Sequence, residues 1–453
     1  MNIIIVGAGV TGLAAAISLR RAGSGHRITI YERSSMTNEV GAAINVPPNV
    51  GRFLLKWGLD PIKSRFVSTT GMYFMSHETL SLLPGPAAVF DHSRNTELYG
   101  APLYYAHRVD LLDALRRLAT DPDSHPSSPP VTIYLKSEVV SYNPSTPNIT
   151  LSDGRTLQAD LVIAADGIHS TAVQHVLGGH ANPASVPKTG TQGNVCYRFL
   201  IPRVDVDSDP DTKWFNDTPL ALGCRIWVDI PNRKRLLQYP CRDHETLNFV
   251  AIMRDDDYTL AQRKEDWLAP VDTAELLQKY SNFNKGLLNV IAKARDVKRW
   301  PLLYRPPIGK WHTTGGGLVL AGDAAHPMLP HHAQAGAQGI EDGLALGLVL
   351  HGVSDKSEIE HHLKLYEKIR RNRASAIQVM SNFGFDEKMP DEVVEFLEGW
   401  EIPKTPSEML KIAYTPDVVG RTVQTMMEFD SSWKLPEGFF VNVPKPSGGD
   451  ALS

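Results

Sequence analysis

Three glycines near the N-terminus have the spacing of a loop that holds a diphosphate. They lie in the segment Gly7-Ala8-Gly9-Val10-Thr11-Gly12, after an apolar run and before an Ala-rich stretch with helical spacing. Gly7 permits a tight turn, Gly9 lets a pyrophosphate approach the main chain, and Gly12 permits close packing of the helix on the strand. Amides at the helix N-terminus would then face the phosphates. The segment is typical of a site for an ADP-containing cofactor, and it leaves NAD and FAD as alternatives.

Three acidic residues stand where predicted strands end. Glu32 closes the second predicted strand, 20 residues after Gly12, a spacing that suits a carboxylate accepting hydrogen bonds from ribose hydroxyls. Asp166 and Asp323 each follow a later apolar run of the same form. Ligands of α/β folds bind beyond the carboxyl ends of the strands. We therefore expect Asp323 to face the nucleotide crevice.

Other clusters of reactive side chains are less complete. The three cysteines include no C-x-x-C pair, so neither a disulfide framework nor a zinc site is indicated. His326, His331 and His332 lie close together in the sequence, but no acidic or cysteine partner completes a recognisable ligand spacing. No metal is expected.

The composition is that of a globular protein with more than one lobe. At about 150 residues per domain, a chain of 453 residues suggests two or three domains. The chain is 42% hydrophobic and 21% charged, which argues against wholesale disorder. Its net charge of −4 lacks the basic excess of a phosphate-backbone binder, so no nucleic-acid partner is expected.

The apolar N-terminus is interpreted as a strand and not as a targeting signal. It has no basic n-region, and it carries spaced glycines in place of a small-residue cleavage site. No uninterrupted apolar window of 18 or more residues occurs elsewhere, so no spanning helix or stable membrane anchor is expected. The cysteine pattern favours a reducing compartment. We expect a cytoplasmic protein, either a monomer or a homodimer.

Hydrophobic periodicity predicts alternating strands and helices, which carry the candidate residues. Strands are predicted at residues 3–6, 27–31, 159–165 and 317–321. Helices are predicted near residues 13–21 and 50–57, from within residues 105–110 to about 119, and near residues 338–351. Asp110 is the expected N-cap of the third helix. A small meander is predicted from strands at residues 131–135, 138–142 and 149–151. Long alternating runs between residues 184 and 300 indicate a second domain built on a sheet.

Three separated motifs resemble those of the group A flavoprotein aromatic hydroxylases, the family of para-hydroxybenzoate and salicylate hydroxylases. The matching residues are Gly7 to Gly12 with Glu32, then Ala165-Asp166-Gly167-Ile168-His169-Ser170, then Gly322-Asp323-Ala324-Ala325-His326-Pro327 continuing through Gly336 to Asp342. The motifs keep the family's order and approximate separations. The substrate domain resembles the family only loosely, with some likeness to fungal phenol-dearomatising monooxygenases.

The resemblance implies an α/β fold in which a Rossmann-like FAD domain with a parallel sheet is interrupted by a mixed-sheet substrate domain and followed by a helical C-terminal part. We predict an FAD domain at residues 1–183 and 301–385, a substrate domain at 184–300, and a C-terminal helical part and tail at 386–453. Residues 444–453, rich in Pro and Gly, are expected to be poorly ordered. The length argues for a minimal hydroxylase without a further C-terminal thioredoxin-like domain.

The resemblance also implies that FAD fills the first fold and that NAD(P)H is a transient co-substrate, in keeping with the lack of a second glycine motif. Glu32 would hold the adenosine ribose, and Arg108 would reach the FAD phosphates or the ribityl chain. Asp323 would accept a hydrogen bond from a ribityl hydroxyl. Ala43 and Asp166 complete this part of the predicted cofactor-binding set.

The loop after Asp323 is expected to act on the flavin through its backbone. Reduced flavin carries negative charge near N1, which amides at a helix N-terminus would stabilise. Gly336 and Ala337 are small enough to bring those amides close, and Pro330 would line the reactive side. One residue departs from the family pattern, because Gln174 stands where an arginine is usual.

The implied activity is a monooxygenase reaction on a phenolic or hydroxybenzoate-type substrate. NAD(P)H would reduce FAD, O₂ would form a flavin C4a-hydroperoxide, and one oxygen atom would pass to the activated phenol. Arg198 resembles a pocket-lining arginine that pairs with a phenolate or carboxylate. Tyr239 resembles a substrate-orienting tyrosine, and His331 is the loop's candidate base. Each of the three could instead be structural.

Several alternatives stay open at this point. Ring hydroxylation, oxidative decarboxylation and hydroxylative dearomatisation of a larger phenol all use the same oxygen donor. A flavoprotein that does not hydroxylate is a competing class. An NAD dehydrogenase is another, although it would not need the Asp166-Gly167 and Gly322-Asp323 segments.

Overall fold

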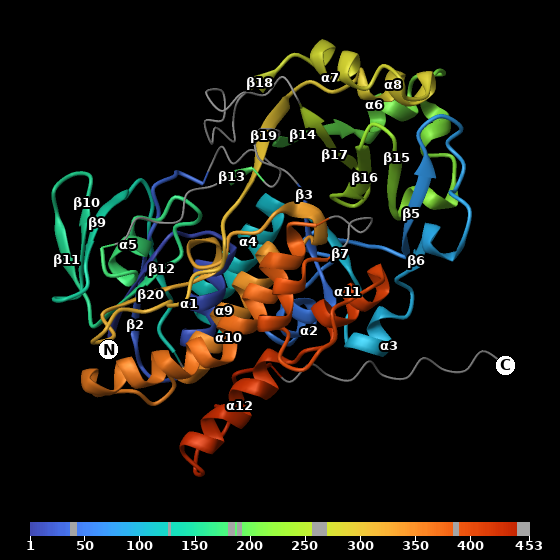
Figure 1. The fold of residues 1–453 in the computed structure, drawn as a ribbon. Helices are drawn as coiled ribbons and strands as arrows, with labels where there is room; N and C mark the ends of the chain where they lie inside the picture. The colour runs from blue at the N-terminus through green and yellow to red at the C-terminus, as the bar shows by residue number, and fades with distance from the viewer. Residues whose placement is uncertain are drawn as a thin grey trace.

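The computed structural model describes residues 1–36, 43–125, 128–179, 186–187, 193–255, 270–383 and 389–441. A helix-rich half built on a parallel sheet lies beside a broad second sheet that carries its own helices (Figure 1). The predicted tail at residues 444–453 lies outside the described residues, as do the predicted boundaries at 183–184 and 385–386.

The parallel sheet is built from the apolar runs that the sequence indicates. Its strand order is β20-β12-β1-β2-β8, and every neighbouring pair is parallel. The strands are β1 Asn2–Val6, β2 Arg27–Tyr31, β8 Thr132–Tyr134, β12 Leu161–Ala164 and β20 Leu318–Leu320. Because β20 pairs with β12, the chain returns to its first sheet after more than 150 intervening residues. The carboxyl ends of β1, β2, β12 and β20 therefore meet at one edge.

The predicted meander was wrong in its first strand. Residues of β8 pair in parallel with β2, and the rings of Tyr31 and Tyr134 stack at 5.2 Å between centroids. The preceding helix, α4 Arg108–Thr120, lies between the two strands in the sequence and makes a parallel crossover feasible. The remaining antiparallel sheet consists of β9 Val139–Asn143, β10 Asn148–Leu151 and β11 Thr156–Gln158.

An alanine-rich helix and a glycine-rich helix pack tightly against each other beside the parallel sheet. These are α1 Val10–Arg21 and α9 Ala335–Val349, and α9 begins three residues before the predicted start. A Cβ at Gly343 would lie 2.5 Å from the Ala15 nitrogen, and a Cβ at Gly347 would lie 2.1 Å from Ser18 Oγ. The close approach of the two helices therefore requires glycine at both positions.

Other helices lie between α1 and α9 in the sequence and after α9. They are α2 Pro48–Lys56, α3 Asn95–Tyr99, α5 Ala172–Val176, α10 Ile359–Ser381, α11 Pro406–Tyr414 and α12 Val418–Phe429. The prediction that Asp110 caps α4 was wrong. His107 precedes the helix and makes no side-chain cap, while Asp110 accepts two hydrogen bonds of 2.9 Å from Arg242. Among the residues that the structure describes, no helix combines the length and apolar character that a membrane crossing needs.

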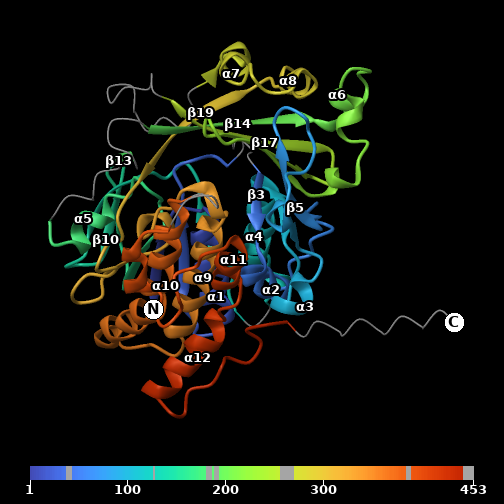
Figure 2. The same cartoon turned by 45° about the vertical axis from the view of Figure 1, so that its right-hand side comes forward.

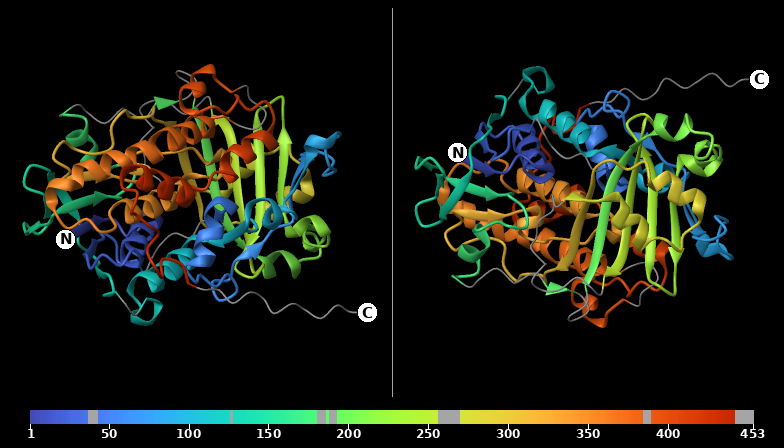
Figure 3. Two further views of the ribbon diagram at one scale, coloured as in Figure 1. Left: turned by 90° about the horizontal axis from the view of Figure 1, so that it is seen from below. Right: turned by 90° about the horizontal axis from the view of Figure 1, so that it is seen from above.

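The second sheet is broad and mixed, with order β13-β19-β14-β17-β16-β15-β5-β6 and β18 beside β19. Its strands are β5 Gly71–Ser76, β6 Val89–Asp91, β13 Val186–Pro187, β14 Gly193–Pro202, β15 Cys224–Asp229, β16 Lys234–Cys241, β17 Thr246–Asp255, β18 Pro270–Val271 and β19 Val297–Tyr304. Figure 3 shows the strands side by side. The sheet thus includes β5 and β6, which the sequence analysis did not place in it.

The two faces of this sheet have different partners. One face packs on α7 Thr273–Lys279 and α8 Lys285–Ile291, through a core that includes Tyr197, Phe199 and Phe249. These helices lie on the side away from α9 and α10, so the sheet stands between them and the helical half (Figures 1 and 2). A small sheet of β3 Ala43–Val46, β7 Tyr104–His107 and β4 Val67–Ser68 stands between the two halves.

Candidate active site

One large cavity of about 1820 Å³ joins the edge of the parallel sheet to the inner face of the second sheet. Its lining includes Gly7, Glu32 and Asp323 on one side and Arg198 and Tyr239 on the other. Pockets for a single small ligand usually measure about 300–1,000 Å³. The cavity therefore has room for a dinucleotide cofactor together with a second molecule.

The glycine loop has the geometry that a bound diphosphate requires. Gly7 has φ +98°, and a Cβ there would lie 2.5 Å from the Ala165 carbonyl oxygen. A Cβ at Gly12 would lie 2.0 Å from the Gly7 carbonyl oxygen, so Gly12 serves helix packing. At Gly9 no atom of the described chain lies within 4 Å of an added Cβ. Gly9 lines the cavity, so its missing side chain leaves space for a ligand.

Glu32 stands at the end of β2 with both carboxylate oxygens engaged by the backbone. Oε2 accepts from the Ala8 amide and Oε1 from the Ser34 amide, each at 2.8 Å. The carboxylate is thereby fixed beside the glycine loop. Each oxygen keeps a lone pair that can accept from a ribose hydroxyl.

Asp166 and Asp323 both lie on the cavity wall, as their strand ends predict. Asp166 accepts a hydrogen bond of 2.5 Å from the Tyr142 hydroxyl, and burial raises the pKa of its carboxyl. The Asp323 side chain is exposed toward the cavity. Partial desolvation by the surrounding protein raises the pKa of Asp323, while nearby His326 and Arg108 act against the rise. Arg108, at the start of α4, thus lies on the same cavity wall near Asp323.

The N-terminus of α9 is directed at the cavity through small residues. Gly336 and Ala337 belong to its first turn, whose amides have no partners within the helix. Gly336 lines the cavity, and a Cβ there would lie 2.9 Å from Ile44 Cδ1. The Ala337 side chain packs into the core instead. Of these two predicted residues, therefore, Gly336 borders the cavity, whereas Ala337 is buried and is not among its lining residues.

The peptide of Ala43 is held from both sides by the second sheet. Its carbonyl oxygen accepts from Arg198 Nη2 at 2.8 Å, and its amide donates to Asn248 Oδ1 at 3.2 Å. The Arg198 guanidinium also lies over the Trp300 ring, 4.6 Å from its centroid. Sequence reasoning found Arg198 and Ala43 but missed Asn248, which no local motif marks. Its position facing the cavity on β17, one strand from Arg198, comes from sheet pairing alone.

Two polar groups beside this contact lack partners. Arg198 Nε and Asn248 Nδ2 are buried and make no hydrogen bond with any described residue. The orientation of the Asn248 amide follows from its neighbour, since only its oxygen can accept from the Ala43 amide. A buried donor without an acceptor costs free energy, which favours a ligand or water there.

Tyr239 lies on β16 directly opposite Asn248 on β17. Its ring packs at 4.5 Å, centroid to centroid, against Tyr105. Burial raises the pKa of the Tyr239 hydroxyl, and the charge of Arg198 only partly opposes this. The hydroxyl therefore stays protonated at neutral pH and can donate a hydrogen bond.

The histidines of the later loop have separate environments. His331 is half-buried and lines the cavity between Pro330 and His332. His332 bonds the Phe383 carbonyl oxygen at 2.8 Å, and burial lowers its pKa to about 4. Gln174, at the position that departs from the family pattern, is exposed on α5 and is absent from the cavity lining.

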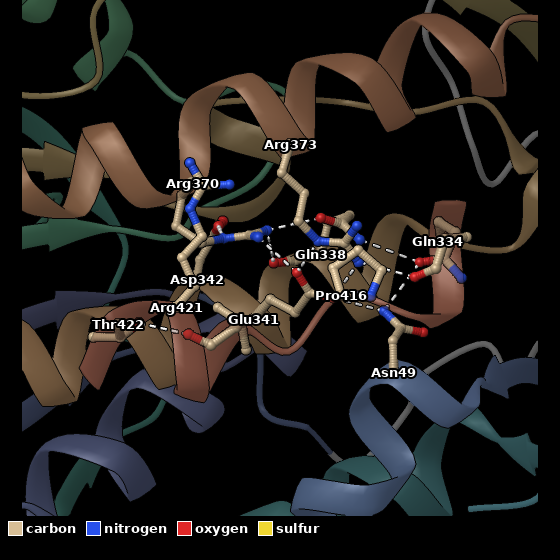
Figure 4. Close-up of polar contacts among 12 residues, drawn as sticks. Asn49, Gln334, Gln338, Glu341, Asp342, Arg370, Arg373, Pro416, Arg421 and Thr422 are labelled. Atoms are coloured by element: carbon tan, nitrogen blue, oxygen red, sulfur yellow. Dashed lines mark hydrogen bonds and ion pairs between the residues drawn. The ribbon is translucent and has the colours of Figure 1, made fainter. Parts of the chain in front are cut away.

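A fully buried charge network supports the cofactor side of the cavity (Figure 4). Glu341 accepts from Arg370 Nη1 at 2.6 Å and from two nitrogens of Arg373 at 2.7 Å. Asn49 of α2 donates to the same carboxylate at 2.7 Å. The sequence analysis included Glu341 and Asp342 in a motif but did not predict their partners on α10.

Asp342 links that network to the strand end that bears Asp323. One carboxylate oxygen accepts from Arg370 Nε at 2.9 Å, and the other accepts from His326 at 2.6 Å and from the Gly322 amide at 2.8 Å. His326 thus has a structural partner, since its ring nitrogen donates to a buried carboxylate. The network holds the turn at Gly322 in place.

The residues present fit FAD. A glycine loop with open space at Gly9, a fixed carboxylate at Glu32 and a helix N-terminus at Gly336 follow the wall of one cavity. Cavity room remains beside buried donors on the second sheet. Together the fold and the cavity define an oxidoreductase that binds a dinucleotide cofactor beside a second ligand.

Comparison with known proteins gives the family. The profile of an FAD binding domain matches residues 258–381, and that of an NAD(P)-binding Rossmann-like domain matches residues 5–44. The FAD-dependent monooxygenase cfoG of Aspergillus candidus is 42% identical over 440 residues, covering 97% of this chain and 98% of its own. The chain therefore belongs to the FAD-dependent monooxygenases, with FAD as cofactor.

Two further similarities agree with this result. Hispidin-3-hydroxylase of Neonothopanus nambi is 32% identical over 391 residues, covering 84% of this chain and 87% of its own. The structure of a salicylate hydroxylase substrate complex aligns with a TM-score of 0.66 at 21% identity, covering 97% of each chain. The expected fold of the aromatic hydroxylases is thereby confirmed, and an NAD dehydrogenase is excluded.

Proposed function

We propose that this chain uses NAD(P)H and O₂ to insert one oxygen atom into a phenolic substrate held between the FAD and the second sheet. One observation carries the proposal. The same cavity that follows the glycine loop and Glu32 also exposes Arg198, Tyr239 and Asn248. The relative named hispidin-3-hydroxylase supports hydroxylation as the reaction class.

FAD, when bound, supplies the electron transfer and the activation of O₂. The chain's own task is to hold it. Glu32 would accept from the adenosine ribose, and Arg108 would neutralise phosphate charge or contact the ribityl chain. Asp323 would accept from a ribityl hydroxyl. The first-turn amides of α9 would stabilise negative charge on the reduced ring.

The substrate oxygen would accept hydrogen bonds from donors on the second sheet. Arg198 Nε and Asn248 Nδ2 have no other partners among the described residues, and the neutral Tyr239 hydroxyl can donate beside them. Donors and a positive charge around a phenol oxygen favour its ionised form. An ionised phenol has a more electron-rich ring, which suits attack by an electrophilic oxygen.

His331 would take the phenol proton from the loop side of the cavity. The remaining walls near these groups are mostly apolar, with Leu237 and Val250 on the sheet and Leu329 on the loop. Apolar walls limit water at the reacting atoms, and that protects an oxygen-transfer step from unproductive release of peroxide.

A direct assay tests the proposal. The purified protein should be yellow, and its consumption of NAD(P)H and O₂ should accelerate with a cognate phenol. A product that gains one oxygen atom and keeps any carboxyl group would exclude decarboxylation, and loss of aromatic absorbance would indicate dearomatisation. A colourless protein, or reductant consumption indifferent to every phenol, would refute the proposal.

A further inference from the structure

The cavity continues across the second sheet beyond the polar groups of the proposed site. The strand register defines one row of residues that face it. In this row Arg198 stands opposite Val250, Val250 opposite Leu237, Leu237 opposite Ile226, and Ile226 opposite Phe74. All five residues line the cavity. The row therefore passes from a charged end on β14 to an apolar end on β5.

The neighbouring row repeats this gradient. Asn248 stands opposite Tyr239, whereas Met72 stands opposite Cys224 farther along the sheet. Burial raises the pKa of the Cys224 thiol to about 12, so this side chain is neutral at ordinary pH. Phe90 of β6 stands opposite Met72 and extends the apolar wall to the sheet's last strand.

We call this wall the apolar arm and define it by Met72, Phe74, Phe90, Ile226, Leu237 and Val250. Strands in a sheet lie about 4.8 Å apart, so the three intervals from β17 to β5 span about 14 Å. A single benzene ring is much shorter than that. No charged side chain interrupts either row between β17 and β5.

The cofactor accounts for the other end of the cavity. The residues that fit FAD belong to the parallel sheet, α4 and α9, whereas the arm belongs to the strands farthest from β19. Displacement of water from an apolar wall by an apolar ligand lowers the free energy of binding. The substrate is the second ligand that this cavity must hold.

We propose that the substrate is a phenol bearing an extended apolar substituent. Its oxygen accepts hydrogen bonds from Asn248 Nδ2 and Arg198 Nε, and its substituent lies along the apolar arm. The inference rests on the proposed hydroxylation, because it assigns the arm to the substrate of that reaction. It places simple hydroxybenzoates among the poor substrates.

A series of para-alkylphenols from methyl to hexyl tests the arm in the FAD-loaded enzyme. Two quantities are measured for each phenol. One is the dissociation constant, from the change in flavin absorbance on binding, and the other is kcat/KM for phenol-stimulated NADPH or NADH consumption. Each methylene buried in the arm should tighten binding about fourfold until the arm is filled.

Two variants locate the effect, with one matched control. Ile226→Trp fills the arm, so it should remove the gain from long chains and leave the methyl compound's affinity within about twofold. Phe74→Ala removes one wall and should weaken only the longer phenols, which keeps the test usable if the larger side chain prevents folding. Val89→Trp is the control, since Val89 is 43% exposed on β6 and does not line the cavity.

The outcomes separate the arm from the reaction. Chain-length-dependent binding without turnover would refute the proposed hydroxylation and keep the arm as a ligand site. Two results would overturn the assignment of the arm to the substrate. One is a dissociation constant that does not change with chain length, and the other is an Ile226→Trp effect equal for short and long phenols. Wild-type behaviour of Val89→Trp with loss of long-chain preference in both arm variants would support it.

Discussion

The Arg198 guanidinium donates to the Ala43 carbonyl oxygen across the junction of the two halves, at 2.8 Å. The same arginine lies over Trp300 and keeps Nε without a partner among the described residues. One side chain thus ties β3, which lines the cofactor cavity, to β14 of the second sheet. In the proposed reaction, Arg198 would contact the substrate and also support the cofactor pocket.

Arg198→Ala should impair turnover more than cofactor retention. We expect kcat/KM for a phenol to fall about 10- to 100-fold, since hydrogen bonds to a charged group are worth about 1.5–3 kcal/mol. Steady-state kinetics and the flavin-to-protein absorbance ratio measure the two effects. Arg203→Ala is the control and should change neither quantity, because Arg203 is only partly buried and pairs with Asp207 away from the cavity lining. Loss of flavin with normal turnover of the remaining holoenzyme would show that Arg198 only supports the fold.

Gly9→Ala should weaken FAD binding without destabilising the apoprotein. Gly9 has φ −71° and an added Cβ meets no described protein atom within 4 Å, so only a ligand would be crowded. We expect about a tenfold or greater loss of FAD affinity, measured by titrating FAD into the apoprotein. The apoprotein's free energy of unfolding should stay within about 0.5 kcal/mol of the wild type.

Gly12→Ala supplies the contrast for that experiment. Its Cβ would lie 2.0 Å from the Gly7 carbonyl oxygen, so the apoprotein itself should be destabilised. Equal FAD affinities of Gly9→Ala and the wild type would contradict the placement of the diphosphate over Gly9.

Much of the cofactor side could be predicted from local sequence. The glycine spacing, Glu32 and the strand-ending acids Asp166 and Asp323 each have a local signal, because a dinucleotide site is built from successive strand ends. The start of α9 was placed three residues late, since Ala335 and Gly336 are weak markers of a helix N-terminus.

The substrate side depends on long-range pairing, which a single sequence does not reveal. Asn248 reaches the Ala43 amide, 205 positions away along the chain. Asp110 has the spacing of a helix cap, but its carboxylate instead accepts two hydrogen bonds from Arg242, just after β16 of the second sheet. Strand β5 joins that sheet through pairs such as Phe74 with Ile226, which lies far along the chain on β15.

Arg370→Met should destabilise the whole fold. Removing one partner of a buried ion pair leaves charges uncompensated, here on Glu341 and Asp342, and typically costs about 3–5 kcal/mol. Chemical denaturation monitored by circular dichroism measures the loss. The neighbouring Arg371→Met is the matched control. The Arg371 side chain is 39% exposed, so its loss should change the free energy of unfolding by less than about 0.5 kcal/mol. Equal effects of the two variants would contradict a stabilising network.

The same network predicts acid sensitivity. Burial alone would raise the pKa of Asp342, but His326 and Arg370 bring it below its ordinary value, and Arg373 and Arg370 do the same for Glu341. The unfolded chain therefore binds protons that these folded carboxylates resist. Their contribution is complete above the ordinary carboxyl pKa of about 4 and is lost as the pH falls through the lowered values. Unfolding titrations from pH 7 downward should show this loss, with a shallower acid slope in Arg370→Met; an equal or steeper slope would refute it.

In the proposed reaction, the enzyme with FAD bound in this cavity transfers one oxygen atom from O₂ to a phenol. The most direct measurement is a turnover under isotopically labelled O₂, with NAD(P)H and a para-alkylphenol, followed by mass spectrometry of the product. We predict a product that contains one labelled oxygen atom, formed in step with the reductant consumed. Consumption of NAD(P)H that yields only hydrogen peroxide with every phenol, or a product whose new oxygen comes from water, would contradict the account.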